Sequence, residues 1–295
     1  MADTILVTGA SGKLGTRVMH HLLDTYHVPA SSIIAGSRDT ARLAELAARG
    51  VETRKVDFED ADGLQASFAG VDQLLIISTD VLDGTDRRLR QHQAAVAAAK
   101  AAGVRHILYT SMPNPDDSKV LFAPDHKGTE DAIRATGLSH TIFRNSWYME
   151  NLLMSLPHAV ASGQWYSSAG TGKLAHIARD DVARAIAASL ASPATGSATY
   201  TLTGPVAYTT DEIAELVSMV AGKPLAVVHV TDEQLAQGME AAGVPAPYVP
   251  TFVSFDANTR AGKIDIVTED AATLSGAKPV SMKDFLDASK AALLG

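Results

Sequence analysis

A strand-turn-helix signature with three glycines near the start of the chain constrains its fold more than any other feature. Gly9, Gly12 and Gly15 follow the apolar residues 5–7, which read as a buried strand, and precede apolar side chains at helical spacing. Such glycines let the backbone approach a ligand, and free N–H groups at a helix N-terminus attract an anion. Although the spacing differs from the usual dinucleotide fingerprint, the segment predicts a pyrophosphate site, with a turn that binds nothing as the alternative. The residues expected to contact the ligand are Gly9, Ala10, Ser11, Gly12, Lys13, Leu14 and Gly15.

Apolar segments alternate with amphipathic segments through the first half of the chain. Near-continuous apolar strands between helices are typical of a parallel sheet covered on both faces. We therefore predict an α/β fold, a Rossmann-type doubly wound parallel sheet whose ligand lies across the carboxyl ends of the strands. The expected strands are residues 5–7, 32–36, 51–56, 73–78, 106–109 and 139–143, and the expected helices are residues 40–48, 60–69, 86–102 and 125–136.

Beyond residue 150 the pattern becomes irregular. We expect an NADP-binding domain over residues 1–150 and a smaller α+β lobe, binding the substrate, over residues 151–295, with the chain allowed to cross back to the first domain. Three prolines at positions 245, 247 and 250 predict a stiff loop before Phe252 and Phe255. The expected helices of this half are residues 180–190, 210–221 and 232–242, and the expected strands are residues 200–203 and 225–230.

The composition excludes several classes of function. A formal net charge of −8 without any basic run argues against a nucleic-acid-binding surface. The chain has no cysteine, which excludes disulfides and thiolate chemistry. We expect no bound metal, because the one helix face that carries several histidines lacks a second ligand cluster. With neither a secretion signal nor an apolar stretch long enough to cross a bilayer, we expect a cytoplasmic protein without membrane contact.

Residues that follow the second, third and fourth expected strands indicate which dinucleotide is preferred. Arg38, which follows a serine, suits the 2′-phosphate of NADP, whereas NAD sites commonly place an acid there; the alternative is a solvated charge beside Asp39. Asp57 either receives the adenine amino group or caps the following helix. Ser78 and Thr79, at the end of the fourth strand, are expected to contact the cofactor. NADPH is therefore the expected cofactor.

Several motifs together resemble the atypical short-chain dehydrogenases of the NmrA-like group, over essentially the whole chain. Within that group the resemblance is strongest to the flavin-free, NADPH-dependent quinone reductases and the triphenylmethane reductases. Residues 143–151 are fairly specific for this branch, while the glycine turn is shared by the whole superfamily. The resemblance implies an NADPH-dependent reductase whose second lobe lies over the nicotinamide. The other segments that carry it are residues 37–38, 74–79, 98–104 and 109–111.

A missing motif narrows the reaction class. Ordinary short-chain dehydrogenases protonate their substrate with the tyrosine of a Tyr-x-x-x-Lys pair, and no tyrosine here has a lysine four residues later. A ketone needs such an acid because its reduction makes a strongly basic alkoxide. A quinone becomes a phenolate-like quinol of pKa about 10, which water can protonate, and a triarylmethyl cation needs no proton. We therefore expect direct hydride transfer to an electron-poor planar acceptor that needs only positioning.

Four residues are the catalytic candidates. Asn145 ranks first because its amide can orient the carboxamide or the quinone oxygen, and Tyr148 stands in the same motif. The resemblance implies a contact of His126 or Lys127 with the nicotinamide ribose; the alternative is a solvated polar pair in a first helical turn. The aromatic residues that offer a stacking surface, with packing in the core as the alternative role, are Trp147, Tyr148, Phe252 and Phe255.

Two rival functions stay open from the sequence. An NADP-sensing regulator, as NmrA is, would bind oxidised and reduced cofactor alike and catalyse nothing. A carbonyl or dye reductase would turn over acceptors in an order that does not follow quinone reduction potential. The expected partner is a small planar molecule, and a homodimer is the assembly left open.

Overall fold

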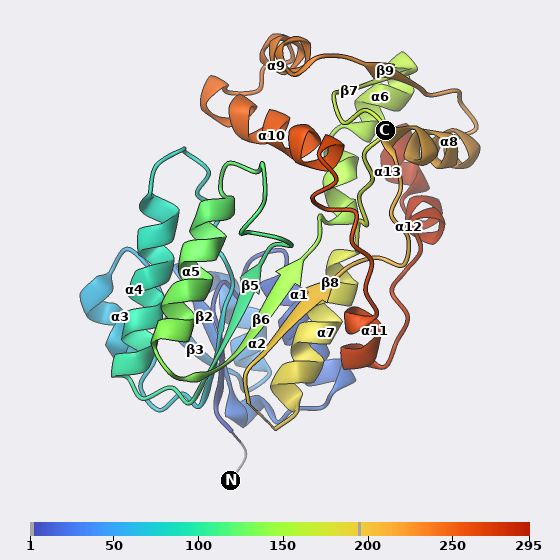
Figure 1. Cartoon of the computed structure of the whole chain (residues 1–295). Helices are drawn as coiled ribbons and strands as arrows, with labels where there is room; N and C mark the ends of the chain where they lie inside the picture. The colour runs from blue at the N-terminus through green and yellow to red at the C-terminus, as the bar shows by residue number, and fades with distance from the viewer. Residues whose placement is uncertain (1–2, 194–195) are drawn as a thin grey trace.

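The computed structural model describes residues 3–193 and 196–295, and its main element is a parallel sheet of seven strands (Figure 1). The strands lie in the order β3-β2-β1-β4-β5-β6-β8, so the strand order reverses between β1 and β4. In a doubly wound sheet a ligand binds at such a switch point, outside the carboxyl ends of the strands. The predicted Rossmann-type α/β fold is confirmed. The strands are β1 (Ile5–Val7), β2 (Ile33–Ser37), β3 (Glu52–Lys55), β4 (Gln73–Ile76), β5 (His106–Ser111), β6 (Ser139–Asn145) and β8 (Ala198–Leu202).

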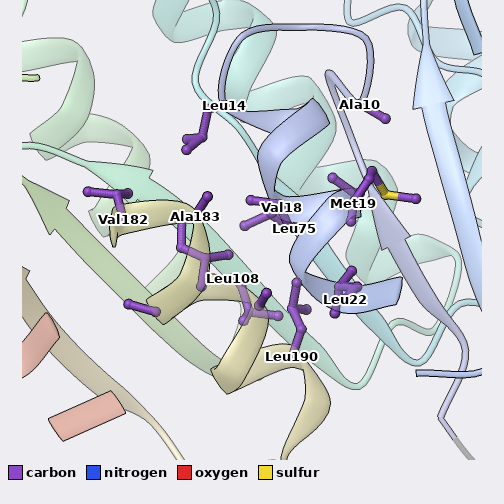
Figure 2. Packing of buried hydrophobic residues seen from close by; sticks show 14 of the residues in the cluster. Ala10, Leu14, Val18, Met19, Leu22, Leu75, Leu108, Val182, Ala183 and Leu190 are labelled. Carbon is purple, nitrogen blue, oxygen red and sulfur yellow. The ribbon is translucent and has the colours of Figure 1, made fainter. Parts of the chain in front are cut away.

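Helices cover both faces of this sheet. On one face α1 and α7 pack together, and Val18, Leu22 and Ala183 lie in one fully buried apolar cluster (Figure 2). On the other face α3, α4 and α5 bury a second cluster around Phe68 and Tyr109. Burial on both faces explains why the strands read as continuous apolar runs. The helices are α1 (Gly15–His20), α2 (Ala44–Ala48), α3 (Ala61–Ser67), α4 (Arg87–Ala101), α5 (Ala123–Ala135) and α7 (Arg179–Ala191).

A smaller lobe lies beyond the carboxyl edge of the sheet (Figure 1). Its core is a separate apolar cluster that joins α6, α8, α12 and α13, and β7 and β9 form a two-stranded parallel sheet beside it. Capping boxes at Thr209 and Thr231 fix the starts of α8 and α9. The elements of this half are α6 (Leu156–Ser162), β7 (Gln164–Ser167), α8 (Thr210–Ala221), β9 (Ala226–His229), α9 (Asp232–Ala241), α10 (Val249–Arg260), α11 (Asp270–Ser275), α12 (Met282–Ala288) and α13 (Lys290–Leu294).

The second half of the chain contributes to both bodies. α7 and β8 return to the main sheet, where β8 pairs with β6, and α11 packs against α7. These returns follow from burial, because α7 has apolar side chains on almost every face and nine of its thirteen residues are buried. The division of the chain into two domains at residue 150 stays a prediction. α7, β8 and α11 come after that residue and still lie on the main sheet or against its helices.

The predicted proline loop is wrong in its second part. Pro250 stands in the first turn of α10, where the missing N–H costs nothing because that position has no intrahelical partner. Phe252 and Phe255 therefore lie on a helix rather than beyond a loop. A short 3-10 turn, residues 246–248, leads into this helix. Pro245 occupies the N-cap position of that turn, and Pro247 lies within it.

The fourth strand is shorter than predicted. β4 ends at Ile76, and the next three backbone N–H groups bond to side chains instead of to a neighbouring strand. The N–H of Ile77 donates to Thr8 Oγ1 at 3.0 Å, that of Ser78 to Thr110 Oγ1 at 2.9 Å and that of Thr79 to His92 Nε2 at 3.0 Å. The chain thereby turns away from the sheet at the carboxyl edge, where doubly wound folds bind their ligands.

Candidate dinucleotide and acceptor site

The glycine turn after β1 has a backbone that only glycine permits at two positions. Gly9 has φ of +61°, in the left-handed region, and its carbonyl accepts from the N–H of Gly12 at 2.9 Å. A Cβ on Gly15 would lie 2.2 Å from the Gly9 oxygen, so no side chain fits there. Gly9, Gly12 and Lys13 are exposed, whereas Ala10 and Leu14 are buried in the core. The turn thus presents backbone to a ligand, as a pyrophosphate cradle requires.

The end of β2 lies directly beside this turn. The hydroxyl groups of Ser11 and Ser37 are 2.8 Å apart, and Arg42 donates to the Ser11 carbonyl at 3.3 Å. Arg38 is exposed next to Ser37 and makes no hydrogen bond or ion pair within the described part of the chain. Two hydroxyls and two arginines at one edge suit a phosphate. Arg42 lies in the 3-10 turn Thr40–Leu43 that follows β2, and it was not among the residues predicted from the sequence.

Asp57 follows β3 and is only partly buried. Its Oδ1 accepts from the N–H of Glu59 at 3.1 Å. The N-cap of α3 is Asp60, whose side chain accepts from the N–H of Gly63, so the cap alternative for Asp57 is wrong. Its contact with an adenine amino group stays a prediction.

Ser78 and Thr79 lie at the carboxyl edge, between the glycine turn and β5. Thr110 joins them, because its hydroxyl accepts from the Ser78 N–H at 2.9 Å and donates to Ser78 Oγ at 3.2 Å. The side chains of Ser78 and Thr79 are half-buried, which leaves them in reach of a ligand on the sheet edge. The sequence signal for Thr110 was its place at the end of a strand next to the switch point.

The structure places His126 and Lys127 in different surroundings. His126 is buried, with Nδ1 2.8 Å from the Tyr109 hydroxyl and Nε2 2.9 Å from Arg88 Nη2. A contact with ribose would require one of these bonds to break. Lys127 is at the surface, where its ammonium group pairs with Asp131 and lies 3.6 Å from Asp116. The solvated alternative for the pair therefore does not describe His126, and the role of either residue toward the cofactor stays a prediction.

Asn145 ends β6 with a side chain that protein groups do not satisfy. The residue is 5% exposed, and its Oδ1 is buried without a hydrogen-bond partner in the described structure. Its Nδ2 lies 3.4 Å from the Tyr148 hydroxyl, which is a long contact. A buried amide oxygen without a donor costs about 1–3 kcal/mol, so it marks a place where a ligand donor is expected. The carboxamide of a nicotinamide carries such a donor.

Tyr148 is held by the neighbouring motif residues. The guanidinium of Arg179 lies 4.7 Å from its ring centroid, and Arg179 also contacts Asn151 at 3.2 Å. Glu150 accepts from the Arg179 backbone N–H at 3.0 Å. Burial raises the pKa of Tyr148, so its phenol stays neutral at neutral pH. The motif thus orients this ring without supplying the lysine that would activate it as an acid.

The arginine of the same motif has a structural role. Arg144 forms two hydrogen bonds with the fully buried Glu130, at 2.7 and 3.0 Å, and Ser111 donates to Glu130 at 2.6 Å. Burial alone would raise the pKa of Glu130, but these bonds lower it overall, so it stays ionised. The cluster ties α5 to the carboxyl ends of β5 and β6.

Three aromatic rings gather above this edge from distant parts of the chain. Phe122, which precedes α5, lies 5.8 Å from Phe255 of α10 and 6.4 Å from Trp147, measured between ring centroids. Trp147 and Phe255 meet edge to face at 5.3 Å. We call Phe122, Trp147 and Phe255 the aromatic cluster. Phe252 stacks on Tyr248 and lies 5.9 Å from Phe255, next to the cluster rather than in it. Each of these rings is partly exposed, and the three rings of the aromatic cluster also pack against buried Met112, Val120 and Ala123. Packing thus accounts for part of their role, and stacking of a planar acceptor on them stays a prediction.

Within residues 3–193 and 196–295, no group of three or more histidine, aspartate or glutamate side chains is placed to hold a metal ion. No helix among these residues has the length and apolar character needed to cross a bilayer.

Strand order and the glycine turn at the switch point place the chain in the class of Rossmann-type dinucleotide-binding proteins. Within that class it belongs to the NmrA-like family, whose model matches residues 1–286. The resemblance recognised in the sequence is therefore confirmed.

Named relatives and solved structures match between 82% and 97% of the chain. Quinone oxidoreductase 2 of Escherichia coli is 34% identical over 271 residues, 92% of each protein. The NAD(P)H azoreductase of Xenophilus azovorans is 31% identical over 242 residues, 82% of each. The NADPH complex of the E. coli quinone oxidoreductase matches at a TM-score of 0.91 and 32% identity, covering 96% of this chain and 99% of that one. The NADP(H) complex of the triphenylmethane reductase of Citrobacter sp. matches at 0.91 and 34%, covering 97% and 99%.

Proposed function

We propose that the protein is an NADPH-dependent oxidoreductase that passes hydride directly, without flavin, to quinones or similar electron-poor aromatic acceptors. The observation that carries the proposal is the buried Oδ1 of Asn145, which has no hydrogen-bond partner in the described structure. Asn145 precedes Trp147, one of the rings on which an acceptor would stack, by two residues in the chain. The relatives named above act on acceptors of this kind.

The site residues suit this cofactor. The exposed backbone of the glycine turn would receive the pyrophosphate, and Ser37, Arg38 and Arg42 would hold the 2′-phosphate. Ser78 and Thr79 lie along the path to Asn145. NADPH supplies the hydride when it is bound. We assign to Asn145 the orientation of the carboxamide, and to the aromatic cluster the stacking of the acceptor and the exclusion of water.

Proton supply agrees with this class of acceptor. Tyr148 is a neutral phenol whose neighbours are an amide and an arginine placed over its ring, and no lysine follows it at the spacing of ordinary short-chain dehydrogenases. A quinolate anion, whose quinol has a pKa of about 10, can form in the hydride transfer and take its proton from water afterwards, whereas an alkoxide is too basic to form efficiently without an acid at hand. Quinones therefore fit the site better than isolated ketones, and a triarylmethyl cation needs no proton.

The test is NADPH oxidation, followed by absorbance, with protein freed of flavin. The acceptors are 1,4-benzoquinone, a naphthoquinone, a triphenylmethane dye and a simple ketone, each with an enzyme-free control. We expect saturable turnover with quinones and none with the ketone. Tight NADPH binding without oxidation of any acceptor would favour an NADP sensor, and a ranking unrelated to reduction potential would favour a carbonyl or dye reductase.

The setting of this activity is also a proposal. A cytoplasmic location is consistent with the absence of cysteine from the whole sequence. A small planar acceptor is the proposed partner, and a homodimer is to be tested by the molecular mass in solution.

A further inference from the structure

A buried arginine lies next to the aromatic cluster without an acidic partner. Arg88, in the first turn of α4, is 5% exposed. Its Nη2 lies 2.9 Å from His126 Nε2, and its Nε is buried with no hydrogen-bond partner in the described structure. No carboxylate among the described residues lies within ion-pair distance of the guanidinium. Buried arginines are usually paired, so this side chain is a cation that protein charges leave largely uncompensated.

The groups that surround Arg88 do not neutralise it. Arg88 Nη2 can only donate, so Nε2 of His126 accepts, and a neutral His126 then carries its hydrogen on Nδ1, facing the Tyr109 hydroxyl. Burial lowers the pKa of His126 far below its ordinary value, with a further contribution from the charge of Arg88. Asp125 and Asp80 are the carboxylates that oppose the charge of Arg88, and both act from beyond contact distance. Arginine stays protonated in proteins, so the positive charge remains.

The charge faces the place where an acceptor would stack. The Arg88 guanidinium carbon lies 4.8 Å from the ring centroid of Phe122, one of the three rings of the aromatic cluster. Phe122 in turn contacts Phe255 and Trp147. Arg88 is 5% exposed, so little water separates its guanidinium from the Phe122 ring. In such surroundings a charge is screened less than at an open surface.

We propose that Arg88 sets the charge preference of the acceptor site, so that planar acceptors carrying a sulfonate or carboxylate are favoured and cationic dyes are disfavoured. The inference rests on the proposed function, because it assigns the acceptor to the aromatic cluster. It narrows the acceptors from electron-poor aromatics in general to neutral and anionic ones. Two unit charges on the order of 10 Å apart, at an effective dielectric of about 20, change an affinity roughly ten-fold.

The experiment measures binding without turnover, using the protein saturated with NADP⁺. The probes share one scaffold: 4-dimethylaminoazobenzene, its 4′-sulfonate and its 4′-trimethylammonium derivative, with dissociation constants read from the dye absorbance. The variants are Arg88→Gln, which keeps a donor toward His126, and Arg88→Met, which removes it. Arg88→Lys keeps the charge. Arg90→Gln is the matched control, because Arg90 is an exposed arginine of the same helix, 3.4 Å from Asp86.

The wild type is expected to bind the sulfonate more tightly than the trimethylammonium dye. Arg88→Gln and Arg88→Met should weaken sulfonate binding and strengthen trimethylammonium binding by about ten-fold each, so that the preference falls about 100-fold. Arg88→Lys and Arg90→Gln should retain it. Circular dichroism and NADP⁺ affinity report whether each variant is folded. An unchanged preference in a folded Arg88→Gln or Arg88→Met protein, an equal loss in Arg90→Gln, or no binding of any dye by the wild type would overturn the proposal.

Turnover is measured separately on the same proteins with a neutral quinone. If charge-dependent dye binding is found but no variant and no wild type oxidises NADPH, the reductase assignment fails and the charge assignment stands. If quinone turnover is normal in all variants and the dye preference does not change, the charge assignment fails and the reductase assignment stands.

Discussion

The imidazole of His92 accepts a hydrogen bond from the backbone N–H of Thr79, with 3.0 Å between the nitrogens. Because Nε2 accepts and the ring is neutral, Nδ1 carries the hydrogen, and it faces Thr129 Oγ1 at 3.0 Å. The Thr129 hydroxyl donates in turn to the Asp125 carbonyl at 2.6 Å. One buried histidine on α4 therefore connects the loop after β4 with α5, and fixes the backbone at the cofactor edge.

Removing this acceptor should weaken cofactor binding. In His92→Leu the Thr79 N–H loses its partner, which costs about 1–3 kcal/mol, and the loop after β4 is released. We expect the dissociation constant of NADPH to rise about ten-fold. In His92→Gln a side-chain oxygen can still accept, so the constant should stay within about three-fold of the wild type. Fluorescence titration with NADPH measures both dissociation constants. Equal losses of NADPH affinity in the two variants would argue against a role for the hydrogen bond.

The buried histidines predict acid sensitivity of the fold. Burial lowers the pKa of His92 to about 3 and those of His106 and His176 to about 4. Since the unfolded chain binds these protons near pH 6.5, their contribution to stability is present above that pH and is lost as the pH falls toward 4. Between pH 7 and pH 5 each histidine of this kind lowers the free energy of unfolding by about 2 kcal/mol.

Urea unfolding at pH 7 and pH 5 measures that loss, and His106→Asn isolates one histidine. His106 lies at the amino end of β5, away from the candidate site, with Ser139 and Thr141 at hydrogen-bond distance from its ring. The variant should lose about 2 kcal/mol less than the wild type between the two pH values. The same loss in both proteins would contradict the assignment for this residue.

Two glycines of the cradle should respond differently to alanine. In Gly15→Ala the new methyl would lie 2.2 Å from the Gly9 carbonyl oxygen, so the turn must open, and we expect loss of NADPH binding with a clearly lowered melting temperature. In Gly12→Ala the nearest atom is 3.2 Å away, which a small shift relieves. That variant should fold normally and lose affinity only through its proximity to the pyrophosphate. Thermal melts and NADPH titrations of both proteins test whether Gly15→Ala loses more stability and affinity than Gly12→Ala. A Gly15→Ala protein that melts at a higher temperature than Gly12→Ala would contradict the prediction.

Arg38→Ala should separate the two nicotinamide cofactors. If its guanidinium holds the 2′-phosphate, the KM for NADPH rises ten-fold or more, while that for NADH changes little, because charge-assisted bonds to phosphate are among the strong ones. Arg42→Ala should give a smaller effect of the same sign. Arg49→Ala removes an exposed arginine that pairs with Asp24 far from the edge, and serves as the control for net charge. Equal changes for NADPH and NADH in Arg38→Ala would rule out the 2′-phosphate contact.

The sheet and the cofactor turn were predictable because their signals are local. The glycine turn follows a strand and precedes a helix within a dozen residues, and each strand of the first half is a short apolar run. Boundaries were missed where side chains compete with the ladder, as at the end of β4. The proline loop was missed because proline is tolerated in a first helical turn, which a composition rule does not distinguish from a loop.

The site was predictable in its residue types and less so in its contacts. Asn145 and the glycine turn came from motifs, whereas burial of His126 and Arg88 depends on packing of α4 against α5, which brings together residues 38 positions apart. One signal was present in the sequence: Arg88 and His92 stand four residues apart, in line with Ala95 and Ala99 on the buried face of an alanine-rich helix. Polar residues on an apolar face indicate an internal network rather than a solvated surface.

Single-turnover transfer from NADPH deuterated at C4 tests the central claim most directly. Flavin-free protein loaded with the labelled or unlabelled cofactor is mixed rapidly with excess 1,4-naphthoquinone, and the loss of NADPH absorbance is followed. Direct hydride transfer predicts rapid, complete oxidation in one exponential phase, with a rate at least about two-fold slower when the transferred position carries deuterium. No oxidation until flavin is added, or equal rates for both C4 positions and for the unlabelled cofactor, would contradict the proposed mechanism.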